Sequence, residues 1–527
     1  AIASIDKTDK RVTLIHGVTG SGKTVVYLRL IREAVENGKT AIMLVPEISL
    51  TPQMFRQLKA EFGDNAAILH SGLSAGEKFD EWWRLRSGEA KIAVGARSAI
   101  FAPLENLGVI IIDEEHDGSY TSESNPRYFT FDIAKFRADY NDCKLVLGSA
   151  TPSVETYLNA KEGVFNLVKL PKRINKKPLP EMIIADMRTE VRRGNDSAFS
   201  SALVEQLEDC MKKGNQAIIF LNRRGYSQHV VCRECGYVAK CENCDVALNY
   251  HSVGNVLKCH YCGATYKMLT ACPDCGRIHI NYVGTGTQKV VSELKKLFPS
   301  ARILRMDNDT TQNKEGHLKI LEQFSKHEAD ILVGTQMIAK GHDFPSVTLV
   351  GILDADMSLF FSDYRSGERT FQLITQVAGR SGRSGDKGVV VLQTYNPDNP
   401  VLRFATKYDY EGFFEREISL RKTTSYPPYA TIVRVMVESN DEEKGVEALR
   451  KVYEGLSALR ERESDAFLFF NKMKCPIKRL KNKFRFQVLM RIDYKREDVL
   501  NKIYELSLPV SDKNALVYVE INPGNLS

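Results

Sequence analysis

The chain has 527 residues, of which 43% are hydrophobic and 26% are charged, and its formal net charge is +7. This is the composition of a soluble globular protein with roughly three or four domains, and it excludes a fibre or a disordered tail. The sequence has no apolar run of about 18 residues and no signal peptide, so we expect a cytoplasmic protein. A glycine-rich motif begins at Gly17, close to the first residue, and we therefore expect a fragment that has lost its amino-terminal part.

Two series of short apolar segments, rich in β-branched residues, predict two parallel sheets covered on both faces. The first series is RVTLIHG, TAIMLVP, AAILH, KIAVGA, LGVIIIDEEH and KLVLGSATP, and the second is QAIIFLN, ARILRMD, ADILVGT, VTLVGILD and GVVVLQT. The Pro- and Lys-rich segment LPKRINKKPLP separates them. We predict an α/β fold with one lobe over 1–170 and a second over 178–230 and 278–425.

The motif GVTGSGKT follows a predicted strand and precedes a predicted helix, as a phosphate-binding P-loop requires. Its glycines let backbone N–H groups close on phosphate oxygens at a helix amino terminus, where the dipole favours negative charge. Lys23 would reach the β- and γ-phosphates, and the Thr24 hydroxyl would bind Mg²⁺. The alternative is a chance glycine-rich turn. The predicted ATP-binding residues are Gly17, Val18, Thr19, Gly20, Ser21, Gly22, Lys23 and Thr24.

Two carboxylates end the apolar segment VIIIDEEH, about 90 residues after the P-loop. Asp113 can hold Mg²⁺ through water, and Glu114 can orient and deprotonate an attacking water. An acidic turn after a strand is common, but its pairing with a P-loop favours a site of nucleotide hydrolysis.

Eight of the eleven cysteines form four Cys-x-x-Cys pairs, which favours bound metal over disulfides in a cytosolic type of chain. Eight thiolates suit two closed, non-catalytic Cys₄ zinc sites, whereas the usual iron–sulfur spacings are absent. In three pairs a glycine follows, and it can adopt the left-handed turn that points N–H groups at sulfur. The 14 residues between Cys244 and Cys259 favour nested pairing in the insertion 231–277. Zinc 1 would be held by Cys232, Cys235, Cys272 and Cys275, and zinc 2 by Cys241, Cys244, Cys259 and Cys262.

The segment QVAGRSGR contains Arg380 and Arg383, three residues apart and on one face if the segment is helical. A guanidinium from the second lobe can stabilise a transferring phosphoryl group, which raises the rate by about 10³- to 10⁵-fold. A surface salt bridge is the alternative.

Beyond this lobe, the segments ATIVRVMVES, FRFQVLMRI and ALVYVEI predict a small α+β domain over 430–527. Within it, PIKRLKNKFRFQ could bind single-stranded DNA or a partner protein, or be a solvated basic face.

The order of these motifs resembles that of superfamily 2 helicases. GVTGSGKT, LVPEISLTPQ, GARSAIFAP, DEEH, GSATPS, FLNRRGY, VGTQMIAKGHDFP and QVAGRSGR follow one another, and FLNRRGY runs directly into the cysteine cluster. In these details the whole chain resembles the primosomal protein N′ (PriA) family of bacterial replication-restart helicases. The resemblance implies two RecA-like lobes, and the family's nested arrangement supports the zinc pairing given above.

The resemblance also implies roles for further residues. GSATPS would couple ATP hydrolysis to lobe movement, and aromatic residues after DEEH would stack on bases, although these could instead be core residues. The family usually has Lys-Gln where this chain has Thr121-Ser122, and an acidic residue where it has Val25, and neither departure removes a phosphate or metal ligand. The implied DNA-contacting and coupling residues are Glu47, Thr51, Gln53, Arg97, Ser98, Tyr120, Tyr128, Phe129, Gly334, Thr335, Gln336, Lys340, Gly341, Asp343 and Gln376.

As a function, the resemblance implies an ATP- and Mg²⁺-dependent 3′→5′ DNA helicase that remodels stalled or abandoned forks. Its partners would be branched and single-stranded DNA, primosome and helicase-loading proteins, and single-stranded-DNA-binding protein, with no membrane. It would be a monomer associated with the bacterial nucleoid. A duplex translocase is an alternative that does not predict eight zinc cysteines, and a zinc-ribbon scaffold with a vestigial ATPase is disfavoured by the intact Lys23, Glu114 and Arg380.

Overall fold

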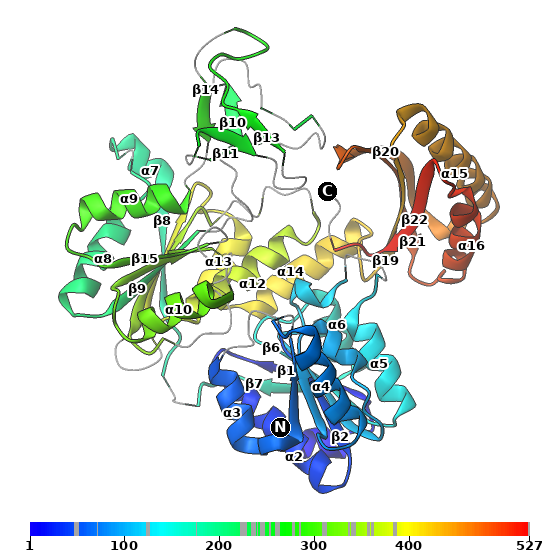
Figure 1. Cartoon of the computed structure of the whole chain (residues 1–527), viewed down its shortest axis with the longest axis horizontal. Coiled ribbons are helices and arrows are strands. Elements are labelled where there is room, and N and C mark those ends of the chain that lie inside the picture. The colour runs from blue at the N-terminus through cyan, green and yellow to red at the C-terminus, as the bar shows by residue number, and fades with distance from the viewer. Residues whose placement is uncertain are drawn as a thin grey trace. The chain divides into compact units, whose positions relative to one another are not determined.

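Seven parallel strands form the sheet of the first lobe, in the order β3-β4-β2-β5-β6-β1-β7 (Figure 1). The computed structural model describes residues 1–524 except 47–51, 71, 123–126, 175–176, 196, 222–228, 233–238, 240, 243–247, 252–253, 259–263, 277–279, 284–285, 308–313, 336–337, 339–343, 356–358, 360–362 and 383–386. The strands are β1 (Val12–Gly17), β2 (Thr40–Leu44), β3 (Ala66–Leu69), β4 (Ile92–Gly95), β5 (Leu107–Asp113), β6 (Lys144–Ser149) and β7 (Asn166–Leu170).

Helices cover both faces of this sheet. A single hydrophobic cluster joins one face to α1 (Ile2–Lys7), α2 (Lys23–Glu36) and α3 (Pro52–Phe62). Because β–α–β crossovers are right-handed, the reversed strand order places α4 (Ala75–Arg86), α5 (Thr130–Tyr140) and α6 (Val154–Lys161) on the other face. The carboxyl ends of β1, β5 and β6 therefore meet at one edge of the sheet, where the P-loop and the acidic pair lie.

The second lobe has a six-stranded parallel sheet in the order β15-β16-β9-β17-β18-β8. Its strands are β8 (Glu181–Asp186), β9 (Gln216–Leu221), β15 (Ile303–Met306), β16 (Ile331–Gly334), β17 (Val347–Leu353) and β18 (Val389–Thr394). Its helices are α7 (Met187–Arg192), α8 (Ser201–Lys212), α9 (Thr287–Leu297), α10 (Lys314–Ser325), α12 (Ser366–Ala378), α13 (Pro400–Thr406) and α14 (Tyr410–Thr423). The predicted α/β class is confirmed, and β7 and β8 are strands that the sequence reading missed.

Two antiparallel sheets complete the chain. The first, β13-β12-β11-β10-β14, contains β10 (His229–Cys232), β11 (Asn249–His251), β12 (Val256–Lys258), β13 (Thr265–Lys267) and β14 (Ile280–Val283). The second, β20-β21-β19-β22, contains β19 (Ala430–Ser439), β20 (Phe467–Leu480), β21 (Lys483–Asp493) and β22 (Ala515–Ile521), and it packs on α15 (Glu442–Arg462) and α16 (Asp498–Ser507). The predicted α+β character of the last part is confirmed.

The chain divides into two compact units. The first contains residues 1–223, 291–360 and 365–414, and therefore most of both lobes. The second contains residues 224–290, 361–364 and 415–527, and therefore both antiparallel sheets. In the described parts of the chain, no helix is long and apolar enough to cross a membrane.

Two glycines of α15 provide a test of this packing. A Cβ atom at Gly445 would lie 2.5 Å from Cε2 of Phe486, whereas a Cβ atom at Gly455 would meet no atom within 4 Å. We expect Gly445→Ala to destabilise the last sheet by about 1–3 kcal/mol through overpacking. Gly455→Ala should stabilise it by about 0.5–1 kcal/mol, because alanine favours the helix. Hydrogen exchange of the β19 amides measures both effects, and equal effects would contradict this packing.

Candidate functional site

The P-loop begins where β1 ends and closes on the first residue of α2. Gly20 and Gly22 have φ values of +78° and +90°, a left-handed conformation that favours glycine over other residues. The turn aims the amino terminus of α2 at the space inside the loop, which suits an anion. The predicted P-loop thus has the backbone geometry that its sequence requires.

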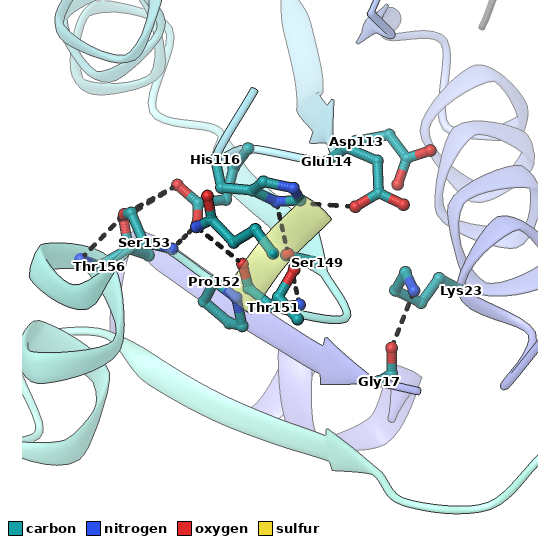
Figure 2. A network of polar contacts seen from close by, with 12 residues as sticks. Gly17, Lys23, Asp113, Glu114, His116, Ser149, Thr151, Pro152, Ser153 and Thr156 are labelled. Carbon is teal, nitrogen blue, oxygen red and sulfur yellow. Dashed lines mark hydrogen bonds and ion pairs between the residues drawn. The ribbon is translucent and has the colours of Figure 1, made fainter. Parts of the chain in front are cut away.

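Two side chains of the P-loop indicate how it would hold a phosphate group. Nζ of Lys23 donates a hydrogen bond to the carbonyl oxygen of Gly17 at 2.8 Å and so lies across the loop (Figure 2). The hydroxyl oxygen of Ser21 is buried, and among the described residues it has no hydrogen-bond partner. A buried hydroxyl without a partner is costly, and a phosphate oxygen would satisfy it. These groups fit a nucleotide.

The acidic pair lies at the carboxyl end of β5. Asp113 accepts a hydrogen bond from the Tyr27 hydroxyl at 2.9 Å, which ties α2 to this strand. Burial raises the pKa of the Asp113 carboxyl to about 6, Glu114 adds to the increase, and Lys23 opposes it. A divalent cation nearby would favour the ionised carboxylate further. The half-buried carboxylate therefore fits a metal-binding role.

Glu114 is connected to the end of β6 through His116. Its φ of +46° is unusual for a residue with a side chain, and such a backbone conformation often marks a functional turn. Oε2 of Glu114 lies 3.7 Å from Nδ1 of His116, which in turn lies 2.8 Å from the hydroxyl oxygen of Ser149 (Figure 2). The same hydroxyl accepts the backbone N–H of Thr151 at 2.9 Å. The DEEH and GSATPS motifs thus form one hydrogen-bonded unit.

Glu115 is a residue of this unit that the sequence reading did not single out. It accepts the backbone N–H of Ser153 at 2.6 Å and the hydroxyl of Thr156 at 3.1 Å, both at the start of α6. Burial raises the pKa of its carboxyl to about 7. A third acidic residue after a buried strand was the available signal, but its partners lie far along the chain.

The second lobe contacts the P-loop through the end of α12. A Cβ atom at Gly379 would lie 2.9 Å from Oγ1 of Thr19, so the backbone that leads into Arg380 lies against the loop. Gln376 is half-buried on α12. Arg383 lies outside the described residues. The structure therefore brings Arg380 near the P-loop, and its catalytic role stays a prediction.

The residues predicted to stack on DNA bases fall into two groups. Tyr120 is 2% exposed and donates a hydrogen bond to the backbone oxygen of Asp113 at 2.8 Å. Its ring has no free face, so the prediction is wrong for Tyr120, which is a core residue. Phe129 is 45% exposed, and the Tyr128 ring lies edge-to-face with Phe101 at 5.1 Å. Phe101 is itself 54% exposed, a further aromatic residue that the sequence reading missed.

Arg97 holds the loop that carries these aromatic residues. Its Nη1 atom donates a hydrogen bond to the backbone oxygen of Thr121 at 2.5 Å, and its guanidinium lies 5.7 Å from the Tyr128 ring centroid. Ser98 lies beside it in the 3₁₀ turn Arg97–Phe101, and Thr335 directly follows β16. Six of the remaining predicted positions lie outside the described residues: Glu47, Thr51, Gln336, Lys340, Gly341 and Asp343. The side chain of Gln53 also lies outside them.

The cysteine-rich sheet is described in part. Cys232 ends β10, Cys241 and Cys272 are buried, and Cys275 is exposed. Gly276 has a φ of +70°, and its N–H donates to the backbone oxygen of Cys272 at 2.9 Å, which confirms the predicted left-handed turn after this pair. Cys235, Cys244, Cys259 and Cys262 lie outside the described residues.

The basic segment of the last sheet is engaged within its own unit. Nη1 of Arg479 donates a hydrogen bond to the backbone oxygen of Glu242 at 3.2 Å, and its guanidinium lies 5.0 Å from the Phe484 ring centroid. Leu480 packs against the small hydrophobic cluster of the cysteine-rich sheet. Part of this segment therefore joins the two antiparallel sheets.

Family models match the chain in four places. The model described as DEAD/DEAH box helicase matches residues 1–159, and the helicase conserved C-terminal domain matches residues 276–385. The PriA DNA helicase Cys-rich region domain matches residues 241–267, and the primosomal protein N C-terminal domain matches residues 422–524. With the two sheets and the P-loop, these matches define a two-lobed P-loop protein of the helicase class.

More particularly, the chain belongs to the family of replication restart protein PriA. It is 47% identical to that protein of Bacillus subtilis over 99% of this chain and 65% of the relative. The corresponding proteins of Treponema pallidum and Haemophilus influenzae are 38% and 36% identical, over 92% and 98% of this chain and 72% and 70% of the relatives. The chain thus spans somewhat less than two thirds of the Bacillus subtilis relative. Among solved structures, RecG bound to a three-way DNA junction has a TM-score of 0.46 and 19% identity, over 79% of this chain and 44% of that one.

Gly148 provides a test of the site geometry. A Cβ atom at this position would lie 1.6 Å from the Tyr27 hydroxyl oxygen. We expect Gly148→Ala to displace this hydroxyl from Asp113, lower the stability of the first lobe by about 1–3 kcal/mol and slow ATP hydrolysis at least about 10-fold. A double variant that carries both Gly148→Ala and Tyr27→Phe should recover part of the stability, because it lacks the clashing oxygen. Thermal unfolding and ATP hydrolysis of the two variants and the unmodified chain check this, and an unaffected Gly148→Ala would contradict it.

Proposed function

We propose that the chain is the motor part of an ATP-dependent DNA helicase that acts in replication restart. The observation that carries this proposal is the meeting of three elements: the P-loop with Lys23, the half-buried Asp113 with Glu114, and the end of α12 with Arg380. Family membership supports the same reading, since the curated relatives are named replication restart proteins. Activity on replication forks is part of the same proposal.

Each residue of the site has a role in phosphoryl transfer. The Thr24 hydroxyl and Asp113 would hold Mg²⁺, which would supply positive charge against the charge that develops on the phosphates. Lys23 and the amino terminus of α2 bind the phosphates, and Glu114 accepts the proton of the attacking water. The Arg380 guanidinium stabilises the transferring group when the lobes are closed, and Arg383 is proposed to assist it.

The exposed aromatic residues near Arg97 suit a single strand of DNA. Phe101 and the half-buried Tyr128 lie edge-to-face, Phe129 follows Tyr128 in the chain and is exposed, and each stacked base contributes about 1–3 kcal/mol regardless of its identity. Arg97 links these aromatic residues to the segment that follows DEEH, so that a change at Glu114 can alter the contact with the bound DNA strand. We propose 3′→5′ movement on forks and branched DNA, followed by primosome assembly and helicase loading together with single-stranded-DNA-binding protein.

Substitutions at two positions of the P-loop site test the motor. We expect Lys23→Ala to abolish DNA-stimulated ATP hydrolysis, because it removes the phosphate-binding cation. Glu114→Gln should still bind ATP but hydrolyse it about 10²- to 10⁴-fold more slowly, because the general base is lost. Lys59→Ala is the matched control, since Lys59 is exposed on α3. If the unmodified chain hydrolysed ATP with forked DNA no faster than Lys23→Ala, the proposed motor would be refuted.

We also propose that the cysteine-rich sheet holds two zinc ions in nested pairs. The pairing of β10 with β14 sets Cys232 opposite Ile280, which follows Cys275 closely in the sequence. β11 and β12 pair Asn249 with Lys258, and Cys259 comes directly after that pair. This register sets Cys232 on the strand pair that the outer cysteines flank in the sequence, which supports the nested pairing. A surface carried by the second lobe could then separate strands or dock a partner.

Metal analysis and one cysteine variant test this assignment. We expect two zinc ions and no iron per chain, and Cys241→Ala should reduce the zinc content to one. This variant should retain DNA-stimulated ATP hydrolysis, because the nucleotide site lies elsewhere in the chain, but lose DNA unwinding. Cys143→Ala is the control, since Cys143 is a buried cysteine of the first lobe. Iron in the protein would contradict the zinc sites, and unchanged unwinding would contradict the role of this surface.

A further inference from the structure

The start of α6 is bound by three buried side chains from the second lobe. Oε1 of Glu368 accepts the backbone N–H of Val154 at 2.9 Å, and Nε2 of Gln372 donates to the backbone oxygen of Thr151 at 3.3 Å. The Tyr410 hydroxyl donates to the backbone oxygen of Pro152 at 2.8 Å. These three side chains are only 4%, 8% and 5% exposed. Three backbone groups within one turn of chain therefore depend on the other lobe for their hydrogen bonds.

A side chain of the first lobe also binds this turn. Glu115, which follows Glu114 directly, accepts the N–H of Ser153 at 2.6 Å. The first N–H groups of a helix lack partners within the helix, and its dipole favours negative charge there. Two successive amides at the start of α6 thus receive one carboxylate from each lobe: Ser153 from Glu115 and Val154 from Glu368. We call residues Thr151–Val154 with Glu368 and Gln372 the interlobe joint.

Helix α12 connects this joint to the P-loop. Glu368 and Gln372 are four residues apart and lie on one face of α12, and Nε2 of Gln372 also lies 3.4 Å from Oε1 of Glu368. The carboxyl end of the same helix lies against Thr19 and leads into Arg380. Because a helix of 13 residues moves as one body, the position of its first turn on Val154 determines where Arg380 lies.

We propose that Glu368 and Gln372 are positioning residues of the ATPase, which place Arg380 over the P-loop by fixing the first half of α12 to the start of α6. This inference rests on the proposed function, because it concerns the same hydrolysis reaction. The interlobe joint is connected to Glu114 in two ways: through the contact of His116 with Ser149, and through Glu115, the next residue in the chain, which binds Ser153. A change at the base thus shifts the helix that carries the arginine.

The magnitude of the effect follows from geometry. A misplacement of about 1 Å at a reacting centre can cost about 10²-fold in rate. The hydrogen bonds of Glu368 and Gln372 given above go to the start of α6, whereas Lys23 lies in the P-loop, so we expect the binding of ATP by Lys23 to change little in their variants. The loss should therefore appear in kcat, with KM for ATP nearly unchanged.

Glu368→Ala is the first experimental variant. We expect it to lower kcat of DNA-stimulated ATP hydrolysis about 10- to 100-fold and to leave KM for ATP within about 3-fold of the unmodified chain. Glu368→Gln should recover most of the activity, because its amide oxygen can still accept the Val154 N–H. Gln372→Ala should have a smaller effect in the same direction. Glu328→Ala is the matched control, an exposed glutamate of the same lobe that should behave like the unmodified chain.

A double substitution separates positioning from general destabilisation. If Glu368 acts through Arg380, Glu368→Ala should slow hydrolysis no further in a chain that already carries Arg380→Ala. Equal fold-losses in both backgrounds would overturn the inference, as would a full loss in Glu368→Gln. Should Glu368→Ala fail to fold, Gln372→Ala carries the same comparison.

The outcomes also distinguish this inference from the proposed function. If the unmodified chain does not hydrolyse ATP, the proposed motor fails. If it hydrolyses ATP and both Glu368→Ala and Gln372→Ala match it in kcat, the motor stands and the inference of an interlobe joint fails.

Discussion

The hydrogen bond between the Tyr27 hydroxyl and Asp113 is the constraint around which the nucleotide site is built. It joins the helix that begins at the P-loop to the strand that carries the acidic pair, and its donor Tyr27 is fully buried whereas Asp113 is half-buried. The missing side chain of Gly148 makes room for the hydroxyl. A carboxyl group buried in this way holds a proton more tightly than usual unless positive charge is close, which is why Lys23 and a metal ion suit the same site.

The end of β6 extends this constraint towards the second lobe. The Ser149 hydroxyl contacts His116. The backbone oxygens of Thr151 and Pro152 accept hydrogen bonds from Gln372 and Tyr410, and the N–H of Val154 donates to Glu368. The groups of Thr151, Pro152 and Val154 that meet the second lobe are backbone groups, which cannot be altered by substitution without moving the chain. Buried backbone groups need partners, so the two lobes are held at this turn by a requirement of the fold itself.

The two antiparallel sheets are stabilised by different means. The last sheet packs its face against two helices in a continuous hydrophobic cluster. The cysteine-rich sheet has only a small described cluster around Ala239, Cys241, Leu248 and Leu257. Small domains are often stabilised by a bound metal, and zinc is the cross-link that the cysteines of this sheet would supply.

Much of the fold and the local chemistry can be predicted from the sequence, because the relevant signals are contiguous. Apolar runs predicted most strands of both lobes, whereas β7 and β8 flank a linker and have weaker patterns. The turn at Gly276 was predicted from its neighbouring cysteines, and the left-handed glycines of the P-loop agree with the motif. The sequence could not distinguish a stacking tyrosine from a buried one, since Tyr120 and Tyr128 stand in the same aromatic segment.

The sequence by itself thus determined the two parallel-sheet lobes, the P-loop, the acidic pair and the cysteine pairs, because each depends on residues close together in the chain. Only the tertiary structure decided that Tyr120 is a core residue, that Tyr27 is the partner of Asp113, and that Glu368 binds Val154. The last two residues are 214 positions apart. No local pattern specifies such a contact, because it depends on how two separately folded sheets bring their edges together.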